Sequence, residues 1–125
     1  MLNPIPNATI LCYAVCHMPD ETGVAHVGSF QSLLGDRTDY EKFSNDLNVS
    51  DTTPPAFLWH TSNDDCVNVI NSYLYAKALR EHHIPHELHV FPEGYHGLGL
   101  AQDNPHVAQW SGLLKNWLKF MGWIK

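Results

Sequence analysis

Positive charge is scarce in this sequence. Its 125 residues include 7 lysines and arginines against 13 aspartates and glutamates, so the net charge is −6 when the histidines are neutral. A protein that binds nucleic acid needs a basic surface, and we therefore expect no nucleic-acid partner. The N-terminal segment lacks a basic region, and its apolar run is too short for a signal peptide or a membrane span. We expect no membrane association.

Cysteine is scarce as well, and the three cysteines are Cys12, Cys16 and Cys66. An odd number without a secretory signal indicates reduced thiols and predicts a cytoplasmic protein. Hydrophobic residues make up 44% of the chain and charged residues 16%, which is typical of a soluble globular protein. Because a chain of this length can bury one core, residues 1–125 are expected to form a single domain.

Three runs of the sequence are typical of strands: residues 8–15, 53–61 and 86–91. Helix-like segments separate them, so the connections are crossovers and the sheet is parallel. We therefore expect an α/β fold in which chemistry collects in the loops beyond the carboxyl ends of the strands.

Two segments carry the clearest helix pattern, with apolar side chains at spacings of three and four residues. They are Val67, Ile70, Leu74 and Ala78 in residues 67–83, and Val107, Trp110, Leu114, Trp117 and Met121 in the last segment. Residues 16–39, which include Pro19, are expected to be irregular except for one helical turn near residues 30–34. A short helix is expected over residues 39–48, with Asp39 as its N-cap.

Two loops at strand ends carry chemistry-bearing side chains. Asp64 follows the second strand, and His96 follows the third between Gly94, Gly97 and Gly99. Glycines at this density indicate a tight loop. An acid and a histidine on neighbouring loops are two of the three groups of a nucleophilic triad, in which the acid orients the imidazole that deprotonates a hydroxyl. We expect His96 within about 2.6 to 3.2 Å of an Asp64 carboxylate oxygen.

Two neighbours of Asp64 have alternative interpretations. Asp65 could be the acid instead, but the spacing to Val67 favours Asp64. Asp65 is then expected to be a charge at the N-terminus of the following helix, where the helix dipole stabilises it. His60 is expected to be structural.

The segments "PPAFLWHTSNDDCV" and "ELHVFPEGYHGLGLA" resemble α/β-hydrolases of the acetyl-esterase and carbohydrate-esterase branch, which is described as xylan-esterase-like or lipase/esterase-like. The earlier "ILCYAV" and "AHVGSFQSLLG" are similar too, so the resemblance covers residues 8–124. In that family the triad runs Ser, Asp or Glu, then His along the chain. The resemblance implies a serine-type esterase with Asp64 and His96 as acid and base, a small ester substrate and no cofactor. Members often have proline at the positions of Ala14 and Asn68.

The sequence contains no Gly-x-Ser-x-Gly and no oxyanion-hole "HGGG" segment. Ser29 in "HVGSFQ" lacks the second glycine and does not follow a buried strand, as the nucleophile of this fold must. We therefore expect residues 1–125 to be the C-terminal half of a hydrolase, in which the nucleophile half is absent.

Two other classes of function stay open. A truncated α/β unit could act through self-association, because the apolar strand 8–15 would be a sheet edge without a charged side chain to block pairing. We therefore expect a homo-oligomer, formed either through pairing of this strand or through apolar helix and sheet faces. The histidines His82, His83, His86 and His89 could form a metal-binding module. However, His86 and His89 are an odd number of positions apart on a strand and point to opposite faces, so no metal is expected.

Overall fold

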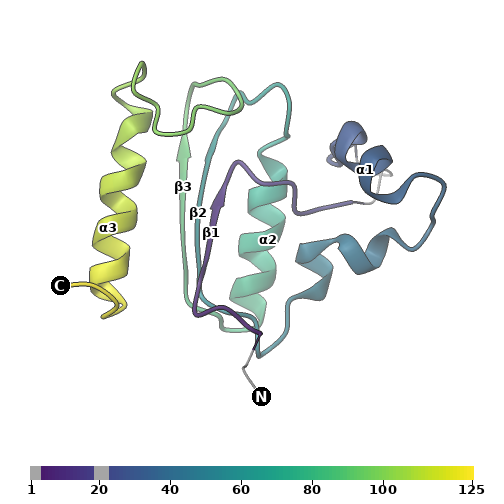
Figure 1. Ribbon diagram of the computed structural model, residues 1–125, viewed down its shortest axis with the longest axis horizontal. Helices are drawn as coiled ribbons and strands as arrows, with labels where there is room; N and C mark the ends of the chain where they lie inside the picture. Colours follow the sequence, from purple (N-terminus) through teal and green to yellow (C-terminus); the bar gives the residue numbers. More distant parts are fainter. Residues whose placement is uncertain (1–3, 19–22) are drawn as a thin grey trace.

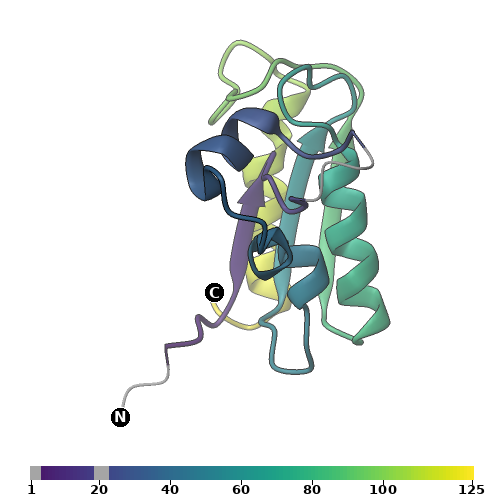
Figure 2. The ribbon, with the colours of Figure 1, turned by 90° about the vertical axis from the view of Figure 1, so that its right-hand side faces the viewer.

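The computed structural model describes residues 4–18 and 23–125, so Pro19 lies outside the described residues. Three parallel strands form one sheet in the order β1 (Thr9–Cys12), β2 (Ala56–Thr61) and β3 (His86–Phe91). Figures 1 and 2 show helix α3 on one face of the sheet and helix α2 on the other. The helical elements are α1 (Val27–Leu34), α2 (Ile70–Glu81), α3 (Trp110–Phe120), and the 3₁₀ turns η2 (Tyr40–Phe43), η3 (Asn45–Asn48) and η4 (Val107–Gln109). The predicted parallel α/β fold is confirmed.

Strand β2 lies at the centre of the sheet, and all six of its residues are buried. Ala56 and Leu58 pack in the cluster on the α2 side, whereas Phe57 and Trp59 pack in the cluster on the α3 side. Because helices cover both faces, every position of this strand is inside the protein. This explains why its sequence is a nearly continuous apolar run.

Strand β1 is shorter than the predicted run of residues 8–15 and is not fully buried. Within residues 4–18 and 23–125 it pairs only with β2, and Ile10 is 46% exposed. The strand ends where Tyr13 adopts a φ of 42°, which a non-glycine residue rarely does. The backbone N–H of Tyr13 still donates to the Trp59 carbonyl at 2.8 Å, so the chain turns away directly after this bond.

Helix α2 was predicted over residues 67–83 but begins at Ile70 and ends at Glu81. Its predicted apolar stripe was only partly right, because Ala78 is buried whereas Ile70 is 40% exposed. The buried face instead includes the polar residues Asn71 and Ser72. Asn71 is buried because its side chain is fully used: its oxygen accepts the N–H groups of residues 16 and 17, and its nitrogen donates to the carbonyls of residues 24 and 68.

The segment before β2 contains more helix than predicted. Helix α1 runs for eight residues, where a single turn was expected. The predicted helix over residues 39–48 was wrong, because the chain forms the two turns η2 and η3 there. Asp39 makes no side-chain capping bond, since Arg37 donates to its carboxylate at 2.8 and 2.6 Å. The same Arg37 hydrogen bond lowers the pKa of Asp39 to about 2.

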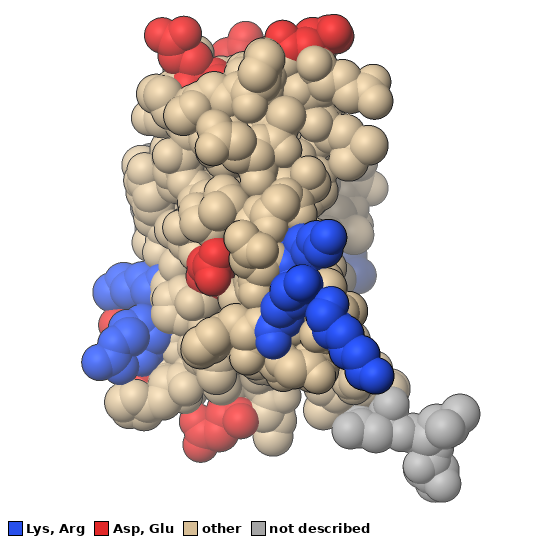
Figure 3. Space-filling view, turned by 90° about the vertical axis from the view of Figure 1, so that its left-hand side faces the viewer, with Lys and Arg blue, Asp and Glu red and all other residues tan. Residues whose placement is uncertain are grey.

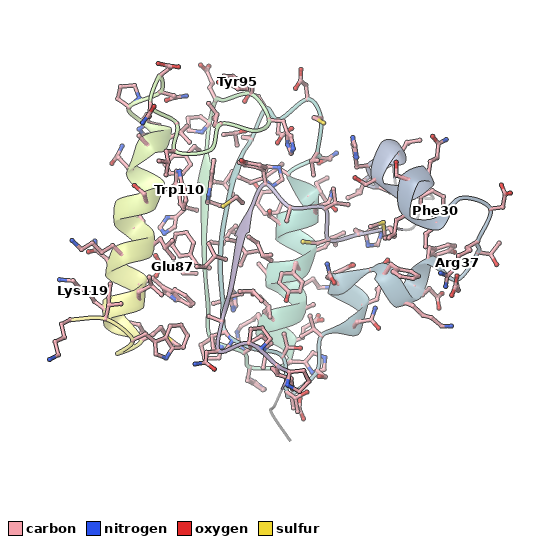
Figure 4. The ribbon with its side chains drawn as sticks, in the orientation of Figure 1. Phe30, Arg37, Glu87, Tyr95, Trp110 and Lys119 are labelled. Atoms are coloured by element: carbon pink, nitrogen blue, oxygen red, sulfur yellow. The ribbon has the colours of Figure 1, made fainter. Side chains whose placement is uncertain are left out.

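Helix α3 confirms the predicted amphipathic helix. Trp110 and Trp117 are buried, and Trp110 lies between α3 and the sheet (Figure 4). The Trp110 ring stacks on Trp59 with 5.2 Å between the ring centroids. Its indole N–H donates to the carbonyl of Gly99 at 2.9 Å, which ties the helix to the loop after β3. Among the described residues, no helix is both long and apolar enough to cross a membrane.

Candidate active site

The loops that follow β2 and β3 lie at the same edge of the sheet, at the top of Figure 1. In the first loop, the Asp64 carboxylate accepts two backbone hydrogen bonds on Oδ1. The donors are the N–H groups of Cys66 and Val67, each at 2.9 Å. This local turn fixes the side chain of Asp64, which is 0% exposed.

Glycine lets the second loop pack closely against the first. A Cβ atom on Gly94 would lie 2.6 Å from the Leu98 side chain and 2.8 Å from the Thr61 methyl group, so no larger residue fits without movement. Gly97 and Gly99 have φ values of 86° and 57°, a backbone region that residues other than glycine rarely adopt. The glycines therefore shape the loop that carries His96.

The two loops bring Asp64 and His96 together, although 32 positions separate them. His96 Nδ1 lies 2.8 Å from Asp64 Oδ2, which confirms the predicted hydrogen bond. Because a carboxylate only accepts, the Nδ1–H of His96 donates. In the neutral ring this leaves a lone pair on Nε2, and the His96 side chain is 30% exposed.

The environment of Asp64 favours its ionised form. Burial by itself raises the pKa of this carboxyl, but the N–H of Val67, the His96 side chain and the N–H of Cys66 outweigh burial. The pKa of Asp64 is thus below its ordinary value, and the carboxylate stays charged at neutral pH. A charged acid can orient the His96 ring and stabilise an imidazolium beside it.

Tyr13 is a site residue that the sequence analysis missed. Its ring meets the His96 ring edge-on, with 4.8 Å between the centroids. Its hydroxyl accepts the backbone N–H of Gly99 at 3.3 Å. Tyr13 thus holds the His96 loop from the end of β1. Its place just beyond the first strand, at the same sheet edge as both loops, was the available signal.

Asp65 and His60 differ in how far they match their predictions. Asp65 is exposed and lies before the start of α2, whose first turn contains no acidic residue. The predicted role of Asp65 as a helix N-terminal charge was therefore wrong. His60 is fully buried, and its two nitrogens contact Ser72 and Val67, as expected for a structural histidine.

Ser29 lies in the first turn of α1 and not on a strand-to-helix elbow. Its hydroxyl lies 2.8 Å from Nδ1 of His26, and its backbone N–H donates to the same nitrogen at 3.1 Å. Within residues 4–18 and 23–125, no hydrogen bond joins Ser29 to His96. Its surroundings are those of a helix-capping pair.

The four histidines considered for metal binding have four different partners. They pair as His82 with Asp51, His83 with Arg80, His86 with the carbonyl of Ile84, and His89 with Glu87. In the part of the chain that the structure describes, no group of three or more His, Cys, Asp or Glu side chains could hold a metal ion.

The sequence pattern of the prolyl oligopeptidase family matches residues 21–120. The chain belongs to the prolyl oligopeptidase family. It is similar to the acetyl ester-xyloside bifunctional hydrolase of Caldicellulosiruptor lactoaceticus, with 45% identity and a TM-score of 0.90. A carboxylesterase of Lactobacillus plantarum is 28% identical, with a TM-score of 0.81. The predicted resemblance to esterase-type α/β-hydrolases is thus confirmed.

These similar proteins are longer than this chain. The chain is covered over 96% and 95% of its length by the two solved structures, but it spans only 44% and 46% of theirs. A curated relative, endo-1,4-beta-xylanase B of Butyrivibrio fibrisolvens, is 46% identical over 110 residues. That match covers 86% of this chain and 17% of the xylanase. The chain therefore corresponds to less than half of each of these relatives.

Proposed function

We propose that this chain supplies the acid and the base of a serine-type ester hydrolase, with Asp64 as the acid and His96 as the base. One observation carries the proposal: the hydrogen bond of 2.8 Å between His96 Nδ1 and the fully buried Asp64 carboxylate. The nucleophilic serine and the oxyanion hole belong to the remainder of such an enzyme.

The chemistry follows from the two ring nitrogens of His96. As the serine hydroxyl attacks the ester carbonyl, Nε2 takes its proton, and the Asp64 carboxylate stabilises the imidazolium that forms. The imidazolium then returns the proton to the departing alcohol. Water repeats the sequence on the acyl-enzyme, so that the ester yields an acid and an alcohol and the serine is regenerated.

We propose short-chain esters, such as acetyl groups on carbohydrate, as the substrates. The names of two relatives, an acetyl ester-xyloside hydrolase and a xylanase, support this choice. The loop that carries His96 also forms a pocket of about 290 Å³. Its lining includes the exposed Tyr95, seen at the top of Figure 4, together with Gln102 and Asp103. An aromatic face beside polar groups suits a sugar ring.

The charge at this end of the molecule supports a substrate that is not anionic. The two loops carry Asp64, Asp65, Glu93 and Asp103. On the face shown in Figure 3, acidic side chains lie at this end and also further down, whereas the lysines and arginines lie only toward the other end. A negative field repels substrates of the same sign, so neutral esters are favoured over anionic ones.

The proposal is tested by placing this chain in a complete enzyme. In a chimera, it replaces the matching segment of the acetyl ester-xyloside bifunctional hydrolase. The chimera should hydrolyse acetyl esters, and His96→Ala should reduce kcat by on the order of 10⁴ or more. The exposed His106 is the matched control, and His106→Ala should keep the rate. A chimera that is folded and active but indifferent to His96→Ala would refute the proposal.

The chain on its own should give no stoichiometric burst with an activated ester, because it contains no Gly-x-Ser-x-Gly. A burst that disappears in Ser29→Ala would assign the nucleophile to Ser29 and contradict the proposal.

Self-association is a second candidate function, and the exposure of β1 favours it. Among the described residues, β1 pairs only with β2, and its other edge carries no paired strand. Ile10 on this strand is about half exposed. A second copy of the chain could pair along this edge.

A further inference from the structure

His60 is a buried titratable residue to which the proposed chemistry gives no role. It lies near the end of β2 with its side chain fully buried, on the same face of the sheet as α2. Its Nδ1 lies 2.8 Å from the hydroxyl of Ser72, which is on α2, and its Nε2 lies 2.9 Å from the carbonyl oxygen of Val67. Both ring nitrogens are therefore engaged.

These contacts determine where the proton of His60 resides. The Val67 carbonyl can only accept, so Nε2 must carry the hydrogen. A neutral ring then has a lone pair on Nδ1, and the Ser72 hydroxyl donates to it. The opposite tautomer would turn a lone pair toward the carbonyl. Burial also lowers the pKa of His60, although the Val67 carbonyl and the Asp64 carboxylate oppose this, so the ring is neutral at neutral pH.

The same nitrogen also faces the acid of the candidate active site. His60 Nε2 lies 3.2 Å from Asp64 Oδ2, the oxygen that receives the hydrogen bond from His96. Both side chains are 0% exposed, so water does not screen the attraction between the N–H and the carboxylate. The donor is thus aimed at the carbonyl of Val67, with the carboxylate as a second, more distant acceptor.

Val67 closes the arrangement into a ring of contacts. Its N–H donates to Asp64 Oδ1 at 2.9 Å, while its carbonyl accepts from His60. His60 therefore restrains the turn that presents Asp64 to His96, and it also places a positive N–H dipole beside the carboxylate.

We propose that His60 is a positioning residue for Asp64: Ser72 holds the imidazole with its hydrogen on Nε2, and this N–H fixes the acid loop through Val67 and stabilises the carboxylate that receives His96. The inference deepens the proposed function and depends on it only for the consequence in catalysis. The contacts themselves can be tested in the 125-residue chain.

The first test is nitrogen-15 NMR of the histidine side chains in the wild-type chain. We expect a neutral His60 with its hydrogen on Nε2. A proton on Nδ1 in the neutral ring would overturn the proposal, and this measurement needs no variant that has to fold.

The second test compares two amide substitutions by carbon-13 titration of the Asp64 carboxyl. In His60→Gln the amide can occupy the place of Nε2 and keep an N–H donor there. In His60→Asn the shorter amide reaches only the place of Nδ1. We expect His60→Asn to raise the proton affinity of Asp64 roughly threefold or more, and His60→Gln to stay close to the wild-type value. Ser72→Ala, which releases the ring, should give an intermediate change.

A purely structural role gives a different result. Thermal unfolding would then show that both amide variants are destabilised, while the carbon-13 titration would show the titration midpoint of the Asp64 carboxyl at its wild-type value. This outcome would overturn the proposal. The result is independent of esterase activity. An inactive chimera with a shifted Asp64 midpoint would reject the proposed function alone, whereas an active chimera with an unshifted midpoint would reject the role of His60 alone.

Discussion

The hydroxyl of Thr61 donates a hydrogen bond of 2.8 Å to the carbonyl of Gly94, which is 33 positions later in the sequence. The backbone N–H of Gly94 in turn donates to the side-chain oxygen of Asn63 at 2.8 Å. These two bonds join the loops after β2 and β3 near the ends of their strands. These contacts, which neither Asp64 nor His96 makes itself, add to the direct hydrogen bond between the two residues in holding the loops together.

Gly94→Ala should loosen this junction. The added Cβ would meet the Leu98 and Thr61 side chains at 2.6 and 2.8 Å, and overpacking of this kind costs about 1 to 3 kcal/mol. Urea unfolding measures the loss. Gly112→Ala on α3 is the matched control, because a Cβ there meets nothing within 4 Å and the helix gains up to about 1 kcal/mol. Equal stabilities for the two variants would contradict the packing argument.

The free energy of unfolding of the chain should decrease as the pH is lowered, partly because of His60. Since the folded pKa of His60 lies below its ordinary value of 6.5, the unfolded chain binds a proton near that pH that the folded chain does not. Stability is therefore lost as pH falls from 6.5 to the folded pKa of His60. Below the folded pKa, the contribution of His60 to stability no longer changes with pH. His60→Gln removes the titrating group and should give a flatter curve in that window.

The measurement is the free energy of unfolding at a series of pH values, with one protein concentration throughout. Parallel curves for wild type and His60→Gln would contradict the lowered pKa. Asp64 acts in a separate and lower window. Because its folded pKa is lowered, its contribution is present above about pH 4 and is lost as pH falls through the folded pKa.

The three thiols should differ sharply in reactivity. Burial, together with the negative charge of Asp46, raises the pKa of Cys16 to about 12, and burial also raises the pKa of Cys12. Cys66 is exposed on the loop after β2. A maleimide reagent should therefore modify one thiol in the folded chain, as counted by mass, and Cys66→Ser should abolish this reaction. Rapid modification that persists in Cys66→Ser, but not in Cys12→Ser, would contradict the burial argument.

The chain should associate at micromolar concentration through the edge of β1 that no other described strand pairs with. Ile10→Lys places a charge on that edge and should shift the sedimentation profile toward the monomer of 14.1 kDa. Val27→Lys on α1 makes the same change at a residue of similar exposure and should leave the profile unchanged. A wild-type chain that sediments as a stable monomer would refute the prediction.

The sequence predicted the features that rest on local patterns. Strand β3 has the predicted bounds, and the pairing of Asp64 with His96 followed from the rule that parallel strands end at one edge. The extent of β1 was not predictable in this way. It depends on the positive φ of Tyr13, and that conformation is held by contacts with Gly99 and His96 from a distant part of the chain.

Buried polar residues were the main source of error. Asn71 and Ser72 interrupt the apolar pattern of α2, so the predicted buried face of this helix did not include them. Their burial depends on partners that local spacing does not reveal: the backbone of residues 16 and 17 for Asn71, and His60 for Ser72. Asp39 failed as a cap for a similar reason, because Arg37 holds its carboxylate.

The most direct test of the proposed triad compares two adjacent carboxylates in the chimera. Asp64 is buried against His96, whereas Asp65 is exposed. Asp64→Asn removes the charge that orients the imidazole and should reduce kcat for an acetyl ester by on the order of 10⁴, whereas Asp65→Asn should keep nearly the full rate. A large loss in Asp65→Asn together with a retained rate in Asp64→Asn would show that Asp64 is not the acid.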